Sequence, residues 1–102
     1  MRYQLVLQFP ANTLDDFDQL VILEDKLTEE LGSVGTVDGH DFGAGEFNIF
    51  VLTDEPATLF SAAQRVVTSH GMQSVMRAAY RELTADNYLI LWPPSLTEFI
   101  VR

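Results

Sequence analysis

The chain of 102 residues has no cysteine, few basic residues and no long apolar run. The absence of cysteine excludes disulfide bonds, thiolate zinc sites and a cysteine nucleophile. Because no run of about 18 apolar residues is present, the sequence predicts no membrane-spanning helix. No targeting segment is recognised at the N-terminus, where polar and apolar residues alternate from the start, and we therefore expect a cytoplasmic protein.

Basic residues are scarce: six Lys and Arg stand against fifteen Asp and Glu, giving a net charge of −9 at pH 7. Nucleic acids and anionic membranes bind through clustered cations, so we expect neither as a partner. Residues 1–55 contain twelve acidic and two basic side chains, whereas residues 56–102 contain three acidic and four basic ones. This asymmetry suits a protein that attracts a basic partner or a second copy of itself, although an acidic surface also serves solubility alone.

The composition is that of one globular domain spanning residues 1–102. Hydrophobic residues make up 47% and charged residues 21% of the chain, which is ordinary for a folded protein of this kind. The length is sufficient for a modest core. No repeat, linker or low-complexity segment divides the chain.

The first part of the sequence predicts a strand followed by a helix. Residues 2–9 alternate between apolar and polar side chains, which indicates a strand with one buried face, and Pro10 ends it. Thr13 followed by Asp16 forms a capping-box-like pattern, so we expect a helix from there to about Leu31. The predicted buried positions of this helix are Phe17, Leu20, Val21, Leu27 and Leu31.

The opposite side of this helix is acidic and forms one candidate partner-binding surface. Ile22 lies among its carboxylates, which are those of Asp15, Asp18, Asp25 and Glu29. Glu24 falls inside the buried stripe, where an unpaired carboxylate is costly. We expect its long side chain to reach the rim of the core, the alternative being a cationic partner.

Two strands are predicted next, over residues 34–42 and 46–53, with a glycine-containing turn of positive φ between them. The second of these strands is apolar on both faces, which is typical of a central strand. Asp54 is predicted to cap a second helix, whose last turn contains His70 in a structural role near the negative end of the helix dipole.

The remaining residues predict two more strands, over residues 72–83 and 88–92. The tail, residues 95–102, fits either a capped helical turn or an edge strand. The order of elements predicts an α+β fold, a ferredoxin-like βαββαβ sandwich with an antiparallel sheet, two helices on one face and a short additional C-terminal strand. Its other face is partly apolar, at positions such as Phe50 and Leu52, so we expect a homodimer that covers it.

The segment between the two middle strands contains the second candidate site. Its ionisable side chains are those of Asp38, His40, Asp41 and Glu46. A histidine among carboxylates is able to bind a divalent metal or to act as acid and base. No H-x-H or other metal-ligand spacing accompanies them, so no metal and no cofactor is predicted. The alternative is that the aspartates bond to turn amides and that Glu46 pairs with an arginine of the neighbouring strand.

Residues 38–50, D-G-H-D-F-G-A-G-E-F-N-I-F, resemble a signature D-G-x-D-x-G-x-G-E-x-N-I-F of a family of small uncharacterised bacterial proteins. The later segments A-A-Y-R (78–81) and L-W-P (91–93) extend this similarity over most of the chain. The resemblance implies a bacterial protein of ferredoxin-like fold and no established activity. Small acidic bacterial proteins of this size include immunity proteins and inhibitors that cover a basic enzyme.

Two functions are therefore expected. The first is a non-enzymatic, acidic interaction module, immunity- or inhibitor-like and homodimeric, that binds a basic protein through the first helix and the 38–46 segment. The alternative is a small-molecule- or metal-binding protein, or a small enzyme, that uses His40, Asp41 and Glu46.

Overall fold

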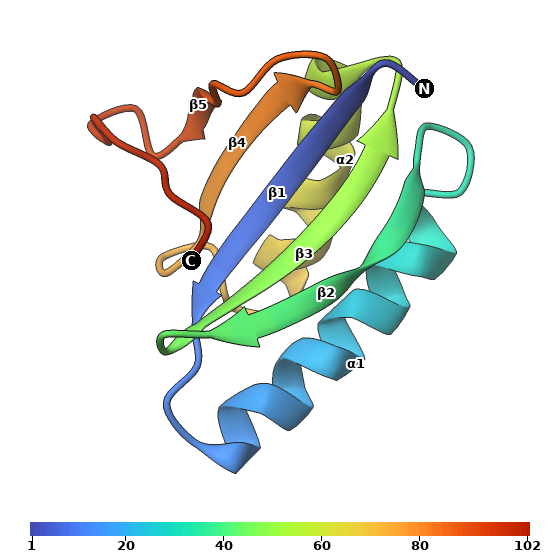
Figure 1. The fold of residues 1–102 in the computed structure, drawn as a ribbon. Helices are drawn as coiled ribbons and strands as arrows, with labels where there is room; N and C mark the ends of the chain where they lie inside the picture. Colours follow the sequence, from blue (N-terminus) through green and yellow to red (C-terminus); the bar gives the residue numbers. More distant parts are fainter.

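The computed structural model describes all 102 residues, as five strands and two helices (Figure 1). In chain order these are β1 (Tyr3–Pro10), α1 (Leu14–Glu30), β2 (Thr36–Gly43), β3 (Glu46–Thr53), α2 (Pro56–Ser69), β4 (Arg77–Glu82) and β5 (Leu89–Trp92). The strands form one antiparallel sheet in the order β2-β3-β1-β4-β5, with both helices on the same face. The α+β class, the antiparallel sheet, the two helices and the fifth strand agree with the prediction. Neither helix combines the length and apolar character that a bilayer-spanning segment needs.

β1 is the centre of the sheet, because β3 pairs along one of its edges and β4 along the other. Leu5, Leu7 and Phe9 point into the core beneath the helices. Val6 and Gln8 alternate with them and are buried on the opposite face. The expectation that only one face of this strand is buried was therefore wrong.

The hydrophobic core lies between the sheet and the two helices. α1 buries Leu20, Leu23 and Leu27 in it, and α2 buries Leu59, Ala63, Val66 and Val67. Leu23 is fully buried although the predicted stripe omitted it. Each large aliphatic side chain in this layer contributes about 1.5–3 kcal/mol of transfer free energy, so the two helices are held to the sheet mainly by this layer.

The two helices begin differently. At α1, the Thr13 hydroxyl accepts a hydrogen bond from the backbone N–H of Asp16 (3.0 Å), and the Asp16 carboxylate accepts one from the backbone N–H of Thr13 (3.2 Å). The predicted capping box is therefore confirmed. At α2 the predicted cap was wrong, because Glu55 is the N-cap and makes no side-chain cap bond. The Asp54 carboxylate instead accepts a hydrogen bond from the backbone N–H of Arg2 (3.0 Å), which links the start of the chain to the end of β3.

Two predicted strand starts were too early. β2 begins at Thr36, and β4 begins only at Arg77, because residues 72–76 form turns that close the end of α2. In these turns the backbone N–H of Met72 donates to the carbonyl of Val67 (3.2 Å). The strand-like sequence pattern extends into these turns because one of their residues, Met76, is buried in the core as a strand residue would be.

The turn between β2 and β3 is a tight two-residue connection. Its central residues, Ala44 and Gly45, both have positive φ (53° and 75°), as the hairpin turns that match the strand twist require. The predicted positive φ is thus found at Gly45, whereas Gly43 still belongs to β2.

The tail after β5 crosses the face of the sheet that the helices leave open (Figure 1). It has no regular secondary structure, so it is neither the helical turn nor the edge strand that the sequence allowed. The Gln8 side-chain amide donates to the carbonyl of Ile100 (2.9 Å), and Phe99 packs against Tyr88 with ring centroids 5.2 Å apart. Phe50 and Leu52 on this face are half-buried in the single chain. The bare apolar surface from which the homodimer was inferred is therefore absent, and the homodimer stays a prediction.

Candidate functional site

The structure does not gather the four ionisable side chains of the 38–46 segment at one place. Because neighbouring residues of a strand point to opposite faces, His40 lies beneath the sheet against α1, whereas Asp41 lies on the open face. Glu46 is on the open face at the far end of β3. Asp38 is exposed at a bulge where the register shifts, next to Gly39 with φ of 118°. No group of three or more potential metal ligands is formed anywhere in the chain.

His40 forms a pair with Glu24 across the boundary between β2 and α1. The His40 Nδ1 atom is 2.8 Å from the Glu24 Oε1 atom, and the imidazole ring is stacked on the buried ring of Phe47 at 4.5 Å. The Glu24 side chain is only 12% exposed, and its Oε2 atom is buried without a hydrogen-bond partner. The predicted position of Glu24 at the rim of the core was therefore wrong. The His40 ring, which is able to carry positive charge, is the partner of the Glu24 Oε1 atom. The pair therefore has a structural role.

Asp41 belongs to a row of hydrogen-bonded side chains on the open face. The Asn48 amide donates to the Asp41 carboxylate (2.9 Å), and the Gln8 amide donates to the Asn48 side-chain oxygen (3.0 Å). Gln8 also reaches the tail through Ile100. Buried polar groups require such partners, so this row fixes the tail on the sheet. The sequence signals that point to the row are the polar residues Gln8 and Asn48 within two largely apolar strands.

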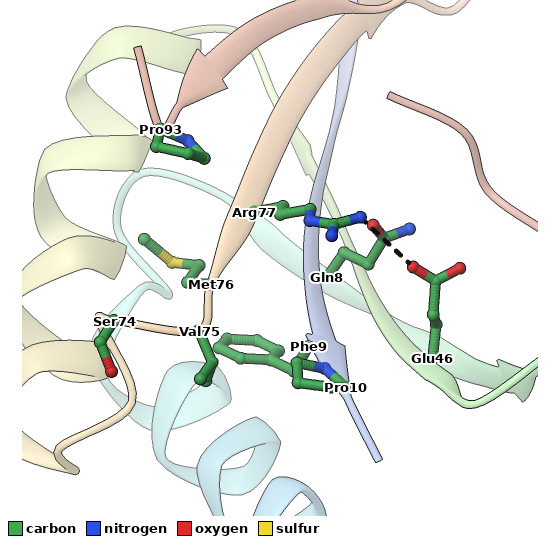
Figure 2. Close-up of a pocket in the computed structure, with 9 residues that line it drawn as sticks. All are labelled: Gln8, Phe9, Pro10, Glu46, Ser74, Val75, Met76, Arg77 and Pro93. Atoms are coloured by element: carbon green, nitrogen blue, oxygen red, sulfur yellow. Dashed lines mark ion pairs between the residues drawn. The ribbon is translucent and has the colours of Figure 1, made fainter. Parts of the chain in front are cut away.

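Glu46 lies between two arginines at the end of the sheet, and Figure 2 shows its ion pair with one of them, Arg77. Its Oε1 atom is 3.2 Å from Arg102 in the tail, and its Oε2 atom is 3.8 Å from Arg77 on β4. Glu46 therefore pairs with arginines, as one of the two alternatives expected, but Arg77 is on β4, two strands away from β3. A hollow of about 300 Å³ opens beside this pair, between the end of β1 and the start of β4. The two charged residues that line the hollow, Glu46 and Arg77, form an ion pair with each other.

The four carboxylates predicted as a partner surface all lie on the exposed side of α1. They are those of Asp15, Asp18, Asp25 and Glu29, and we call this surface the acidic face. None of the four takes part in a hydrogen bond or ion pair within the chain. The only cation of α1, Lys26, is paired with Glu30 at 3.4 Å. Ile22, at the middle of the acidic face, is 53% exposed. The result is a negatively charged helix surface with an apolar residue at its centre.

An apolar hollow of about 400 Å³ lies at the first turn of α1, next to the acidic face. Leu14, Phe17 and Phe42 provide its apolar walls. Leu14 is 78% and Phe42 47% exposed, although both are large hydrophobic residues. Sequence reasoning did not select either of them. The available signals were a leucine outside the buried stripe of its helix and a phenylalanine at the end of an edge strand.

Comparisons with protein-family models, with curated proteins and with solved structures give no match to this chain. The resemblance of residues 38–50 to a bacterial family therefore stays a prediction.

Proposed function

We propose that the protein is a non-enzymatic interaction module that binds a basic protein partner through the acidic face of α1. The observation that carries this proposal is that four neighbouring carboxylates have no partner within the chain. By contrast, three of the six basic side chains, those of Arg2, Arg77 and Arg102, are in ion pairs with acids outside α1. An unneutralised surface of this kind attracts a positively charged protein and raises its association rate.

The position of two of these charges, those of Asp25 and Glu29, opposes the stability of the helix, which favours a role in binding, whereas Asp15 in the first turn is favourably placed. Glu29 lies in the last turn of α1, where no basic residue is present. Negative charge near that end interacts unfavourably with the helix dipole, by about 0.3–1 kcal/mol per charge. Asp25 and Glu29 are also like charges four residues apart, a spacing that costs about 0.2–0.5 kcal/mol. Solubility alone would be served equally well by carboxylates placed elsewhere.

A small-molecule or metal-binding function through His40, Asp41 and Glu46 has no supporting observation. The three side chains have separate partners, Glu24, Asn48 and two arginines, and lie on two faces of the sheet. We therefore put forward the interaction module alone.

Two further features belong to the proposal. The first six elements follow a ferredoxin-like arrangement, which is supported by the central position of β1 between β3 and β4, with β5 added beyond β4. The second feature is a homodimer. It is supported by the exposed side chains of Leu83 (43%) and Leu89 (57%) near the outer strand β5, which leaves one edge of the sheet unpaired. Sedimentation velocity over a range of concentrations tests the homodimer directly.

The interaction is tested by capture from the lysate of the source cell, with the protein immobilised in three forms. These are the wild type, an acidic-face variant (Asp15→Asn, Asp18→Asn, Asp25→Asn and Glu29→Gln) and a control variant in which Asp86→Asn and Glu98→Gln remove charge elsewhere. We expect the wild type and the control variant to retain a basic protein at low salt and to release it at high salt. We expect the acidic-face variant not to retain this protein. Equal capture by all three forms, or no salt-sensitive partner, would contradict the proposal.

A further inference from the structure

We infer that the apolar hollow at the start of α1 receives one aliphatic or aromatic side chain of the partner, flanked by lysine or arginine residues that reach the acidic face. This inference rests on the proposed function and specifies the chemistry of the segment that binds. The occupant is a basic segment of another protein with a single apolar anchor.

Packed aromatic rings form the floor of the hollow. The ring of Phe17 lies at its base and contacts the rings of Phe42 (5.5 Å) and of the fully buried Phe47 (5.4 Å between centroids). Its rim includes Leu14, which the capping box at Thr13 holds at the first position of the helix. An apolar side chain that enters the hollow therefore removes surface of Leu14 and Phe42 from water without reordering the chain.

Negative charge lies beside this hollow. Asp15 directly follows Leu14 in α1, and Asp18 lies one helical turn further along, so Leu14 and Asp18 are neighbours on the helix surface. Both aspartates are exposed and unpaired. The nearest basic side chain in the same helix is Lys26, which Glu30 already neutralises.

The charge selects between the possible occupants of the hollow. A second copy of this chain that docked through the same surface would bring the same carboxylates face to face, and an anionic lipid surface would be repelled. A purely apolar segment would leave the aspartates without partners. A segment with cations on both sides of one apolar residue satisfies the hollow and the carboxylates together.

Strand addition to the neighbouring edge of β2 is a less suitable mode of binding. The bulge at Val37 and Gly39 interrupts the regular edge of this strand, and Asp38 projects from it. Bulges and charges on an edge strand are features that oppose pairing with another strand. Recognition through a side-chain anchor is therefore the mode that this surface supports.

The test is an NMR titration of the isotope-labelled protein with two short synthetic peptides of equal length and charge. One has a leucine between lysine and arginine residues, and the other has glycine at that position. At low salt, we expect the leucine peptide to bind about five- to tenfold more tightly, which corresponds to a partly buried leucine side chain. We expect its largest chemical-shift changes at Leu14, Phe17 and Phe42.

The matched variants are Leu14→Ala and Ile100→Ala, which truncate aliphatic side chains that are 78% and 42% exposed. Ile100 lies in the tail on the sheet face opposite α1, so we expect Leu14→Ala to remove the preference for the leucine peptide and Ile100→Ala to leave it unchanged. Leu14 is 78% exposed, so its truncation leaves the core intact, and a circular dichroism spectrum verifies the fold.

The outcomes separate this inference from the proposed function. If both peptides bind equally well, the apolar anchor is overturned. If the double variant Asp15→Asn with Asp18→Asn also weakens the binding of both peptides, binding driven by charge still holds. Shifts that map outside the hollow while the leucine peptide is still preferred also overturn the apolar anchor. If neither peptide binds the wild type, the anchor fails, and capture of a basic protein from the lysate by the acidic face decides the proposed function independently.

Discussion

Glu24 on α1 and His40 on β2 are joined by a contact of 2.8 Å between the Glu24 Oε1 and His40 Nδ1 atoms. The stripe in α1 correctly places Glu24 towards the core, where its side chain is 12% exposed. Its partner is sixteen positions away on β2, and only the packing of α1 against that strand brings the two together. Helical spacing reveals which face a residue occupies, but it contains no information about contacts between distant elements.

This pair leads to a prediction about stability. His40→Ala leaves the Glu24 carboxylate without its only side-chain partner, and we expect a loss of about 1–3 kcal/mol in the free energy of unfolding. Glu24→Met with His40→Ala removes the buried carboxylate as well, so we expect the double variant to regain most of this loss. Urea denaturation of both variants is the measurement. A double variant that is no more stable than His40→Ala would show that the carboxylate is not the source of the cost.

Two glycines that flank the first turn after α1 offer a second prediction. A Cβ atom at Gly35 would lie 2.9 Å from the carbonyl oxygen of Leu52 and 3.0 Å from a methyl group of Leu59, whereas nothing lies within 4 Å of one at Gly32. We expect Gly35→Ala to destabilise the protein by about 1–3 kcal/mol because buried backbone must shift. Gly32→Ala is the matched control, with an expected change within about 0.5 kcal/mol. Similar midpoints for both variants in chemical denaturation would refute this description of the packing.

At the scale of elements, the start of α1 gives a pH dependence. Hydrogen bonds from the backbone N–H of Asn12, and with smaller effect from the hydroxyl and N–H of Thr13, hold the pKa of the Asp16 carboxyl below its ordinary value of 3.8. A carboxyl whose pKa is lower in the folded state than in the unfolded state stabilises the fold above the unfolded pKa. This contribution is lost as the pH falls through the folded pKa.

We therefore expect Asp16→Asn to be less stable than the wild type at neutral pH and to approach it as the pH falls below about 4. Thermal melting of both proteins over this range is the measurement. Asp18→Asn serves as the control, because that carboxylate makes no hydrogen bond in the chain. A stability difference that stays constant down to the lowest pH would contradict the role of the ionised cap.

The tail gives the next prediction. Removal of residues 95–102 deprives Gln8 of the Ile100 carbonyl and Glu46 of Arg102, and uncovers part of the sheet. We expect a loss on the order of 1–3 kcal/mol and new self-association, visible by denaturation and by sedimentation velocity. Arg102→Ala alone breaks only an exposed ion pair, so its cost should be within about 1 kcal/mol. A truncated chain as stable and as dispersed as the wild type would mean that the tail is not a structural cover.

The elements differ in how far the sequence predicts them. The capping box and the glycine after Leu31 define α1 locally, and its predicted range agrees with the structure. β3 is also found at its predicted residues, because its alternation is bounded by a turn and by the start of α2. The tail has no local pattern, since its position depends on Gln8 and Glu46, more than fifty residues earlier in the chain. The same holds for the candidate site. Helical spacing predicts the acidic face, but no local pattern predicts that Phe42 is exposed.

For the whole molecule, seven of the fifteen acidic residues lie on α1, whose only basic residue is Lys26. Most of the exposed carboxylates of α1 have no ion pair, whereas Arg2, Arg77 and Arg102 are paired with acids outside α1. If the charge at the C-terminal end of the acidic face is maintained for binding, its removal should not harm the fold. We expect Glu29→Gln to raise the free energy of unfolding by about 0.3–1 kcal/mol, because it removes a negative charge from the C-terminal turn. Denaturation at low ionic strength is the measurement, and a clear loss of stability would indicate a structural role instead.

The most direct test of the account is the association rate of the captured basic partner as a function of ionic strength. For the wild type and for the variant with Asp86→Asn and Glu98→Gln, we expect a fast rate that falls steeply as salt increases from about 20 to 500 mM. For the acidic-face variant, we expect a slow rate that depends little on salt. If the acidic-face variant associates as fast as the wild type and with the same salt dependence, the acidic face of α1 is not the binding surface and the proposed function is wrong.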